Sequence, residues 1–168
     1  MTHHDPIVIV GARRTPIGAF QGALAPLSAP QLGATALKAA IADAGVNAAE
    51  LDDVLMGCVL PAGLGQAPAR QAALGAGVPH SVPCTTISKV CGSGMRSVML
   101  ACDQILAGSA RVAAAGGMES MTNAPYFLPK ARDGYRLGHG QILDHMFFDG
   151  LQDAYEGHAM GYFAEEAV

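Results

Sequence analysis

Short apolar runs alternate with helical patterns along the first 117 residues, and this alternation restricts the fold more than any other feature. The runs at residues 6–11, 54–60, 84–88 and 112–117 are short, rich in β-branched or small residues, and bounded by glycine or proline. Such runs are typical of strands buried in a sheet. The first of them predicts a central strand that is covered on both faces.

Helical patterns fill the stretches between these runs. Ser28 and Gln31 have the spacing of a capping box, and apolar residues then recur at helical intervals until Gly45. A second helix is expected over residues 68–76, and a third over residues 95–107, which contain no proline. The order β-α-β-α-β-α-β predicts an α/β fold with a mainly parallel sheet and helices on both faces.

The junction before the third helix is the first place to look for chemistry, because ligands of parallel sheets bind beyond the carboxyl ends of the strands. Cys91 lies there, where unpaired backbone N–H groups and the helix dipole favour a thiolate. Gly92 and Gly94 permit a tight turn and N–H groups that can hold an oxyanion. The pattern predicts a nucleophile elbow with sulfur in place of oxygen. A small buried core cysteine is the open alternative.

The third helix and the other three cysteines are expected to be buried. Nearly every residue from Val98 to Cys102 is apolar, so we expect this helix to be buried on all sides. Cys58, Cys84 and Cys102 lie in apolar surroundings and are interpreted as packing residues. The four cysteines lack CxxC or metal-finger spacing, so we predict free thiols and no metal site.

Composition narrows the function classes. The net charge of -4 and the absence of tryptophan argue against nucleic acid or an anionic membrane as a partner. No apolar run approaches the roughly 20 residues that span a bilayer, and the first residues carry no leader pattern. Together with free thiols, this predicts a cytoplasmic protein. The hydrophobic content of 51% suggests that some surface is buried against something else.

The sequence after Gly117 has a different pattern. Glycine-containing loops separate two short helical patterns, at residues 144–150 and 153–160. We interpret this part as an insertion or a second, looser subdomain. The last residues, 165–168, lie inside a helical pattern that has no cap, which is unusual for a natural carboxyl terminus.

Four motifs in a fixed order suggest a family. They are VIVGARRTPIG at 8–18, GQAPARQA at 65–72, VCGSGM at 90–95 and GGMESM at 116–121. Together they resemble the amino-terminal half of a thiolase, from about residue 6 to the end. The resemblance implies two similar α/β halves packed in five layers, with the active site between them. Residues 1–122 would then form the amino-terminal α/β core, and residues 123–168 the start of a coenzyme A-binding loop domain.

The resemblance also implies site residues. Cys91 matches the family's acyl-accepting cysteine, and its backbone N–H is implied as one donor of an oxyanion hole. Leu151 and Met160 match positions that line the pantetheine channel. Many biosynthetic members carry His-Met-Gly here, whereas this chain has alanine before Met160 and His158 one place earlier, so a histidine contact to coenzyme A is not carried over.

The implied reaction begins with attack of the Cys91 thiolate on the thioester of an acyl-CoA. The acyl-cysteine is then attacked by the α-carbanion of acetyl-CoA, which makes a carbon-carbon bond. Coenzyme A thioesters are the substrates, and no metal or redox cofactor is implied. The complete enzyme would be a homo-oligomer, either a dimer or a tetramer.

Length is the largest departure from the family. The activating histidine, the second cysteine and the asparagine of the oxyanion hole belong to a carboxyl-terminal half with no counterpart here. We therefore expect a truncated product, a fragment or one part of a split enzyme that lacks full turnover alone. Three interpretations stay open: an acetyl-CoA C-acetyltransferase, a broader 3-ketoacyl-CoA thiolase, and a non-catalytic chain that binds acyl-CoA or pairs with a complementary half.

Overall fold

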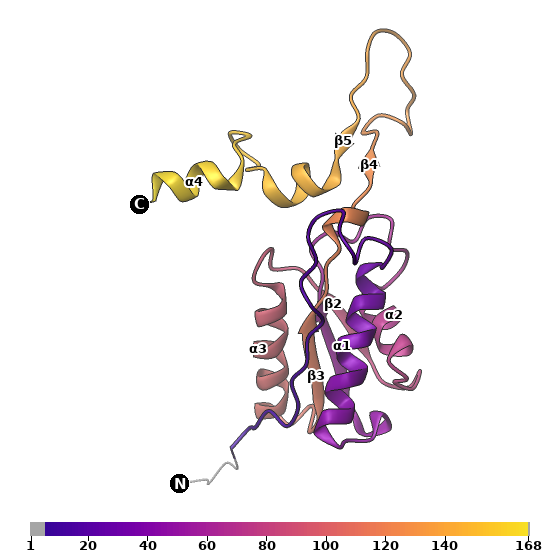
Figure 1. The fold of residues 1–168 in the computed structure, drawn as a ribbon, viewed down its shortest axis with the longest axis vertical. Helices are drawn as coiled ribbons and strands as arrows, with labels where there is room; N and C mark the ends of the chain where they lie inside the picture. The colour runs from indigo at the N-terminus through magenta and orange to yellow at the C-terminus, as the bar shows by residue number, and fades with distance from the viewer. Residues whose placement is uncertain (1–5, 168) are drawn as a thin grey trace.

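The computed structural model describes residues 6–167, and a three-stranded parallel sheet organises them (Figure 1). The strands are β1 (Asp53–Gly57), β2 (Cys84–Ile87) and β3 (Ala113–Gly117). They lie in the order β2-β1-β3, so the first strand of the three is central. In the register, Val54 pairs with Cys84 on one side and with Ala114 on the other.

Helices cover both faces of this sheet. α1 (Ala29–Ala44) and α2 (Pro68–Gly75) pack on each other over one face, and α3 (Ser93–Leu106) covers the other (Figure 1). α1 and α2 begin at sequence signals for a helix start, since proline stands in the first turn of each. The predicted α/β fold, with a parallel sheet and helices on both faces, is confirmed.

The main core lies between the sheet and the α1–α2 layer. Strand residues that point to this face meet small alanines of the two helices, which lets the layers approach closely. The most buried members are Val54, Met56, Cys58, Ala69, Ala72, Ala73 and Met118. The opposite face holds less buried apolar surface, because α3 meets the sheet mainly through Ser93, Ser97 and Ala101.

The remaining elements are short and most of them extend beyond the carboxyl edge of the sheet (Figure 1). They are η1 (Ala48–Glu50), η2 (Met121–Asn123), an antiparallel pair of β4 (Tyr126–Phe127) and β5 (Leu143–Asp144), the π-helix η3 (Met146–Leu151) and α4 (Met160–Glu166). The helix expected at residues 144–150 is confirmed in this π form. The domain boundary expected between residues 122 and 123 stays a prediction.

The prediction of a central strand at residues 6–11 is wrong. This segment is extended but pairs with no strand, and Ile9 is 80% exposed. A strand needs a row of backbone partners, and a cavity instead separates the segment from the edge of β3. Packing of Gly11 against Ala40 and Ala44 of α1 holds it in place, together with an ion pair between Arg13 and Asp43.

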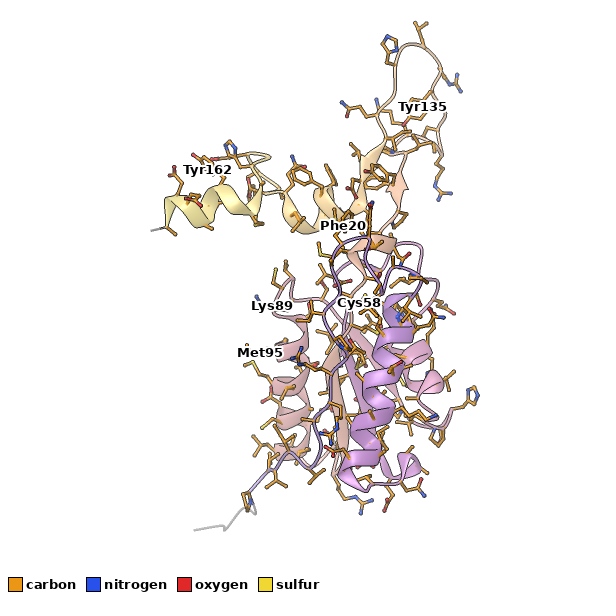
Figure 2. All side chains as sticks on the ribbon, viewed as in Figure 1. Phe20, Cys58, Lys89, Met95, Tyr135 and Tyr162 are labelled. Atoms are coloured by element: carbon orange, nitrogen blue, oxygen red, sulfur yellow. The ribbon has the colours of Figure 1, made fainter. Side chains whose placement is uncertain are left out.

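The expected burial of the third helix on all sides is also wrong. The helix itself is confirmed as α3, but Met95 is 73% exposed and lies on its outer side (Figure 2). Val98 and Met99 are exposed as well. Small side chains at helical spacing face the sheet, and no other described element covers the opposite face.

Two further boundaries differ from the sequence expectation. β1 ends at Gly57 instead of residue 60. The Cys58 N–H still donates to the Ile87 carbonyl of β2 at 3.0 Å, but the N–H groups of Val59 and Leu60 bond the Glu119 carboxylate and not a neighbouring strand. The helix expected at residues 153–160 is wrong. Asp153 there closes a turn by accepting the backbone N–H groups of Tyr155 and Glu156, and α4 begins only at Met160.

Among residues 6–167, no helix combines the length and the apolar character that crossing a membrane would require.

Candidate active site

The turn between β2 and α3 presents Cys91 to solvent at the start of the helix. The Ser93 side chain holds this turn closed, because its hydroxyl accepts the Lys89 N–H at 2.8 Å and donates to the Val90 carbonyl at 2.5 Å. Ser93 is only 4% exposed, whereas Cys91 is exposed. The predicted elbow around Cys91 is therefore present as a hydrogen-bonded turn.

Val90 carries the strain of this turn. Its φ angle is +49°, in the left-handed region that β-branched residues rarely adopt. The conformation reverses the chain within a few residues and leaves Cys91 facing outward ahead of the first helical turn. Strain of this kind persists only where surrounding contacts fix it, as the Ser93 bonds do here.

Glycines let the start of α3 lie directly on the carboxyl ends of two strands. A Cβ atom on Gly57 would lie 2.6 Å from the Ser93 carbonyl carbon, and one on Gly117 would lie 3.1 Å from the Gly94 Cα. The buried Ser97 hydroxyl adds a polar contact, 2.8 Å from the Gly116 carbonyl. The elbow is therefore fixed to β1 and β3 as well as to the strand that precedes it.

A cavity of about 450 Å³ opens beside Cys91. The loop after β1, the elbow, the end of β3 and the end of η3 form its walls. The lining residues are Gly57, Val59, Leu60, Val90, Cys91, Ser93, Gly94, Gly117, Met118, Glu119, Met121, Gly150 and Leu151. The structure thus places Leu151 in the same cavity as Cys91, and its contact with the pantetheine of a substrate stays a prediction. Met160, at the exposed start of α4, does not line this cavity.

The helix start supplies the favourable electrostatics at Cys91. Arg96 N–H is the first to bond in the helical pattern, to the Gly92 carbonyl at 2.8 Å. The N–H groups of Gly94 and Met95 precede it in the first turn, where a helix has no internal acceptors for them. Such groups and the helix dipole stabilise an anion at this end of the helix. A thiolate on Cys91, or an oxyanion beside it, would benefit from both.

Glu119 lies in the same cavity but its carboxylate is already engaged. It accepts the backbone N–H groups of Val59 at 2.8 Å and Leu60 at 3.1 Å. The Cys58 thiol lies 3.6 Å from the same carboxylate. Glu119 therefore shapes the loop after β1, and each of its carboxylate oxygens accepts a backbone N–H group there.

Cys58 differs chemically from Cys91. Its side chain is buried, and burial, followed by the nearby charge of Glu119, raises the pKa of the Cys58 thiol to about 12. Burial likewise raises the pKa of Cys84. Both observations agree with the interpretation of these two residues as packing residues.

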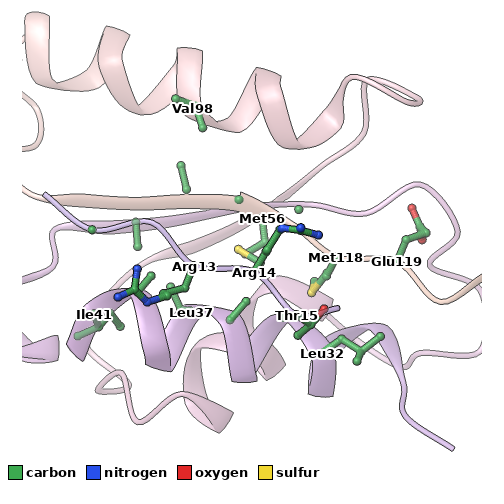
Figure 3. A pocket seen from close by; sticks show the side chains of 18 of the residues that line it. Arg13, Arg14, Thr15, Leu32, Leu37, Ile41, Met56, Val98, Met118 and Glu119 are labelled. Atoms are coloured by element: carbon green, nitrogen blue, oxygen red, sulfur yellow. The ribbon is translucent and has the colours of Figure 1, made fainter. Parts of the chain in front are cut away.

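A second and larger cavity, of about 810 Å³, lies between α1 and α3 (Figure 3). The segment at residues 7–20 forms one wall and the free edge of β3 another, and the lining is mainly apolar. Arg13 and Arg14 lie on the segment side, while Val98 lies on α3 (Figure 3). Cys91 is not part of this lining, so the candidate site is the smaller cavity.

Sequence reasoning missed several residues that shape the site. The roles of Ser93 and Glu119 depend on backbone groups that the fold brings to them, and the sequence carried no direct sign of them. A signal did exist for His145 and Asp149, which are spaced four apart and form a side-chain pair. His158 stacks on Tyr162 at 4.3 Å between ring centroids, on the exposed α4 side of the molecule.

Comparisons with known proteins show which sequences this chain resembles. The family described as "Thiolase, N-terminal domain" matches residues 7–168. An acetyl-CoA acetyltransferase of Cupriavidus necator is 52% identical over 162 residues, which is 96% of this chain and 41% of that protein. Acetyl-CoA acetyltransferase 1 of Arabidopsis thaliana is 54% identical over 159 residues, covering 95% of this chain and 38% of the relative. The chain therefore spans about two fifths of the length of these curated relatives.

Proposed function

This chain belongs to the thiolase family, and on that premise we propose that Cys91 accepts the acyl group of an acyl-CoA in an acetyl-CoA acetyltransferase reaction. The complete reaction would join two acetyl-CoA molecules to give acetoacetyl-CoA and coenzyme A, reversibly. The names of the similar proteins from Cupriavidus necator and Arabidopsis thaliana support this choice over other acyl transfers.

The observation that carries the proposal is the position of the Cys91 sulfur. It is an exposed thiol at the start of a 14-residue helix, on a rigid turn, beside a cavity of about 450 Å³. Exposure, a fixed geometry and a positive helix end are what a thiolate nucleophile needs. The other three cysteines are buried or partly buried.

The first step transfers the acyl group to sulfur. The Cys91 thiolate attacks the thioester carbonyl, and the carbonyl oxygen takes negative charge that open N–H groups at the helix start stabilise. The bond from carbon to the coenzyme A sulfur then breaks as the bond to Cys91 sulfur is kept. Coenzyme A leaves as a thiolate and takes up a proton.

The second step needs a base in addition to the nucleophile. A second acetyl-CoA must lose an α-proton to a base before its carbon attacks the acyl-cysteine. Among the described lining residues, Glu119 and Cys91 are the titratable groups, and Glu119 is engaged by two backbone N–H groups. We propose that the carbon-carbon step requires groups beyond those that line this cavity.

This gap supports the second candidate, a chain that takes up an acyl group without completing turnover. Substrate contacts at Leu151 and Met160, a loop domain from residue 123, and a homo-oligomer remain proposals on the same footing. A preference for acetyl over longer acyl chains is a further proposal. Cytoplasmic location is also proposed, and the four free thiols support it.

The test is acylation of the chain by acetyl-CoA, followed by intact mass measurement and peptide mapping. We expect one added acetyl group, on the peptide that contains Cys91. Cys91→Ala should abolish it, while the matched control Cys102→Ala, which removes a partly buried thiol of α3, should not. Absence of the adduct in the unsubstituted chain, or an adduct spread over several cysteines, would refute the proposal.

A further inference from the structure

His145 is a buried histidine whose two ring nitrogens and backbone N–H all have hydrogen-bond partners. It is 7% exposed and stands immediately before η3. Its Nδ1 lies 2.5 Å from an Asp149 carboxylate oxygen, and its Nε2 accepts the Ala62 N–H at 3.4 Å. Its own backbone N–H donates to the Pro125 carbonyl at 3.0 Å. Because Nε2 is an acceptor, the ring proton is on Nδ1 and is donated to Asp149.

These bonds connect two segments that meet at the Cys91 cavity. Ala62 belongs to the loop after β1, and the same loop supplies Leu60 to the cavity. Asp149 is followed at once by Gly150 and Leu151, which line the opposite wall. A Cβ atom on Gly150 would lie 3.2 Å from Leu60 Cδ2, so the two walls are in close contact.

The loop after β1 is fixed from two directions. Glu119 accepts the N–H groups of Val59 and Leu60 from the β3 side, and His145 accepts the Ala62 N–H from the η3 side. Near its end, the η3 wall bonds the segment that follows it, where Gln152 bridges to Ala159 and its side chain donates to the Gly157 carbonyl at 2.8 Å. His145 links this wall to the loop after β1. The last turn of η3 is a π-turn, in which the Gln152 N–H reaches the Phe147 carbonyl at 2.8 Å. Such turns are rare, and they depend on local contacts to persist.

We infer that His145 is a positioning residue for the acyl-CoA cavity: together with Asp149 it holds the Gly150–Leu151 wall against the loop after β1. The inference rests on the proposed function. His145 does not line the cavity, and its Nε2 is occupied, so it neither touches the substrate nor removes a proton from Cys91.

Loss of the His145 contacts should affect the binding of acyl-CoA more than the attack by the Cys91 sulfur. The elbow that fixes the Cys91 sulfur is made by Ser93 and the strand ends, and His145 contacts none of them. Loosening the Leu151 wall should weaken the hold on the acyl-CoA and leave the attack by sulfur unchanged. The concentration of acetyl-CoA that gives half the maximal acylation rate should therefore rise, with the maximal rate retained.

The experiment compares acylation rates across acetyl-CoA concentrations for three variants and the unsubstituted chain. His145→Ala removes both ring contacts, and His145→Gln keeps an acceptor for the Ala62 N–H. His80→Ala is the matched control, since His80 is exposed in the loop between α2 and β2, outside the proposed loop domain. We expect His145→Ala to raise the half-saturating concentration about tenfold, the size expected when one hydrogen bond to a charged carboxylate is lost. His145→Gln should recover most of the loss, and His80→Ala should match the unsubstituted chain.

Backbone hydrogen exchange gives a readout that does not need acylation. In His145→Ala the backbone N–H groups of residues 59, 60 and 62 and of residues 146–152 should exchange faster, while those of β1 and α3 keep their protection. Unchanged exchange in both segments would overturn the inference, as would a fall in the maximal acylation rate at an unchanged half-saturating concentration. If the unsubstituted chain is never acylated, the proposed function fails, and exchange alone then decides whether His145 joins the two segments.

Discussion

The free-energy cost of the Val90 conformation is similar in size to the free energy that the Ser93 hydrogen bonds contribute. A left-handed conformation costs an ordinary residue about 1–2 kcal/mol. The Ser93 hydroxyl makes two hydrogen bonds across the same turn, each contributing about 0.5–1.5 kcal/mol. The two terms offset one another, so the turn can hold Cys91 outward without a large net cost to stability.

The raised pKa of Cys58 predicts a loss of stability in alkaline solution. Above pH 9.0 the unfolded chain releases the thiol proton, whereas the folded chain keeps it until about pH 12. The folded state then binds more protons, so the free energy of unfolding falls as pH rises through this window. Against Cys58→Ser, which has no thiol to ionise, the unsubstituted chain should lose up to about 1.4 kcal/mol per pH unit.

Urea unfolding of both proteins at several values between about pH 8 and 11 measures this difference. Ionisation of lysine and tyrosine affects the two proteins alike, so it cancels in the comparison. Parallel stability curves would mean that the Cys58 thiolate is tolerated in the folded chain, and the assigned cause, burial beside Glu119, would then be wrong.

At the scale of elements, the contact between α3 and the strand ends depends on Gly57. An alanine there would place a Cβ atom 2.6–2.7 Å from backbone atoms of Ser93 and Gly94, which cannot move without shifting the helix. We expect Gly57→Ala to lower the free energy of unfolding by about 1–3 kcal/mol, as overpacked cores do. Because Cys91 is the exposed thiol of the four, we expect iodoacetamide to alkylate it before the other three, and the displaced elbow should lose this selectivity.

Gly161→Ala serves as the control for this substitution. Gly161 lies in α4, where an added Cβ atom has open space around it, so alanine should leave stability equal or slightly higher. Both variants are measured by urea unfolding and by mass mapping after brief exposure to iodoacetamide. Equal stability of the two variants would contradict the close packing of α3 on β1.

Elements with local signals were predictable, and those that depend on distant partners were not. Gln31 accepts the Ser28 N–H at 2.8 Å, and α1 begins where this spacing predicts. The run at residues 6–11 has the same local signal as a buried strand, but pairing requires a partner edge that the sequence does not specify locally. The hydrogen bonds of Glu119 were equally unpredictable, since they join it to residues some sixty positions away in the sequence.

The elbow itself was predictable because its signal is short-range. Glycines around Cys91, a strand before it and a helix after it lie within one stretch of chain. The burial of α3 was not predictable from its composition. Its apolar outer face includes Met95 and Met99, and composition alone cannot tell a covered face from an uncovered one.

For the whole molecule, this uncovered face predicts association in solution. Met95, Val98, Met99 and Leu106 are exposed on α3. Contiguous apolar surface of this kind favours contacts between copies of a protein in water. We expect the apparent mass from light scattering to rise with protein concentration, and the double substitution Met95→Gln, Met99→Gln to reduce that rise.

Lys38→Gln is the control, because Lys38 is exposed on α1, in the opposite layer. This substitution introduces the same glutamine side chain at the surface but leaves the α3 face unchanged. If the double variant associates as strongly as the unsubstituted chain, the surface that mediates association lies elsewhere. The exposed segment at residues 7–10 is then the next candidate.

The strand register has a consequence for the order in which the chain folds. Val54 pairs with Cys84, thirty positions later, and with Ala114, sixty positions later. Closing such long loops precedes the contacts that repay their entropy, so parallel sheets form slowly. The elbow rests on Gly57 and Gly117, and it cannot pack before both pairings exist. During synthesis, Cys91 therefore remains an ordinary flexible thiol, open to oxidation, until Gly117 has left the ribosome and β3 has joined the sheet.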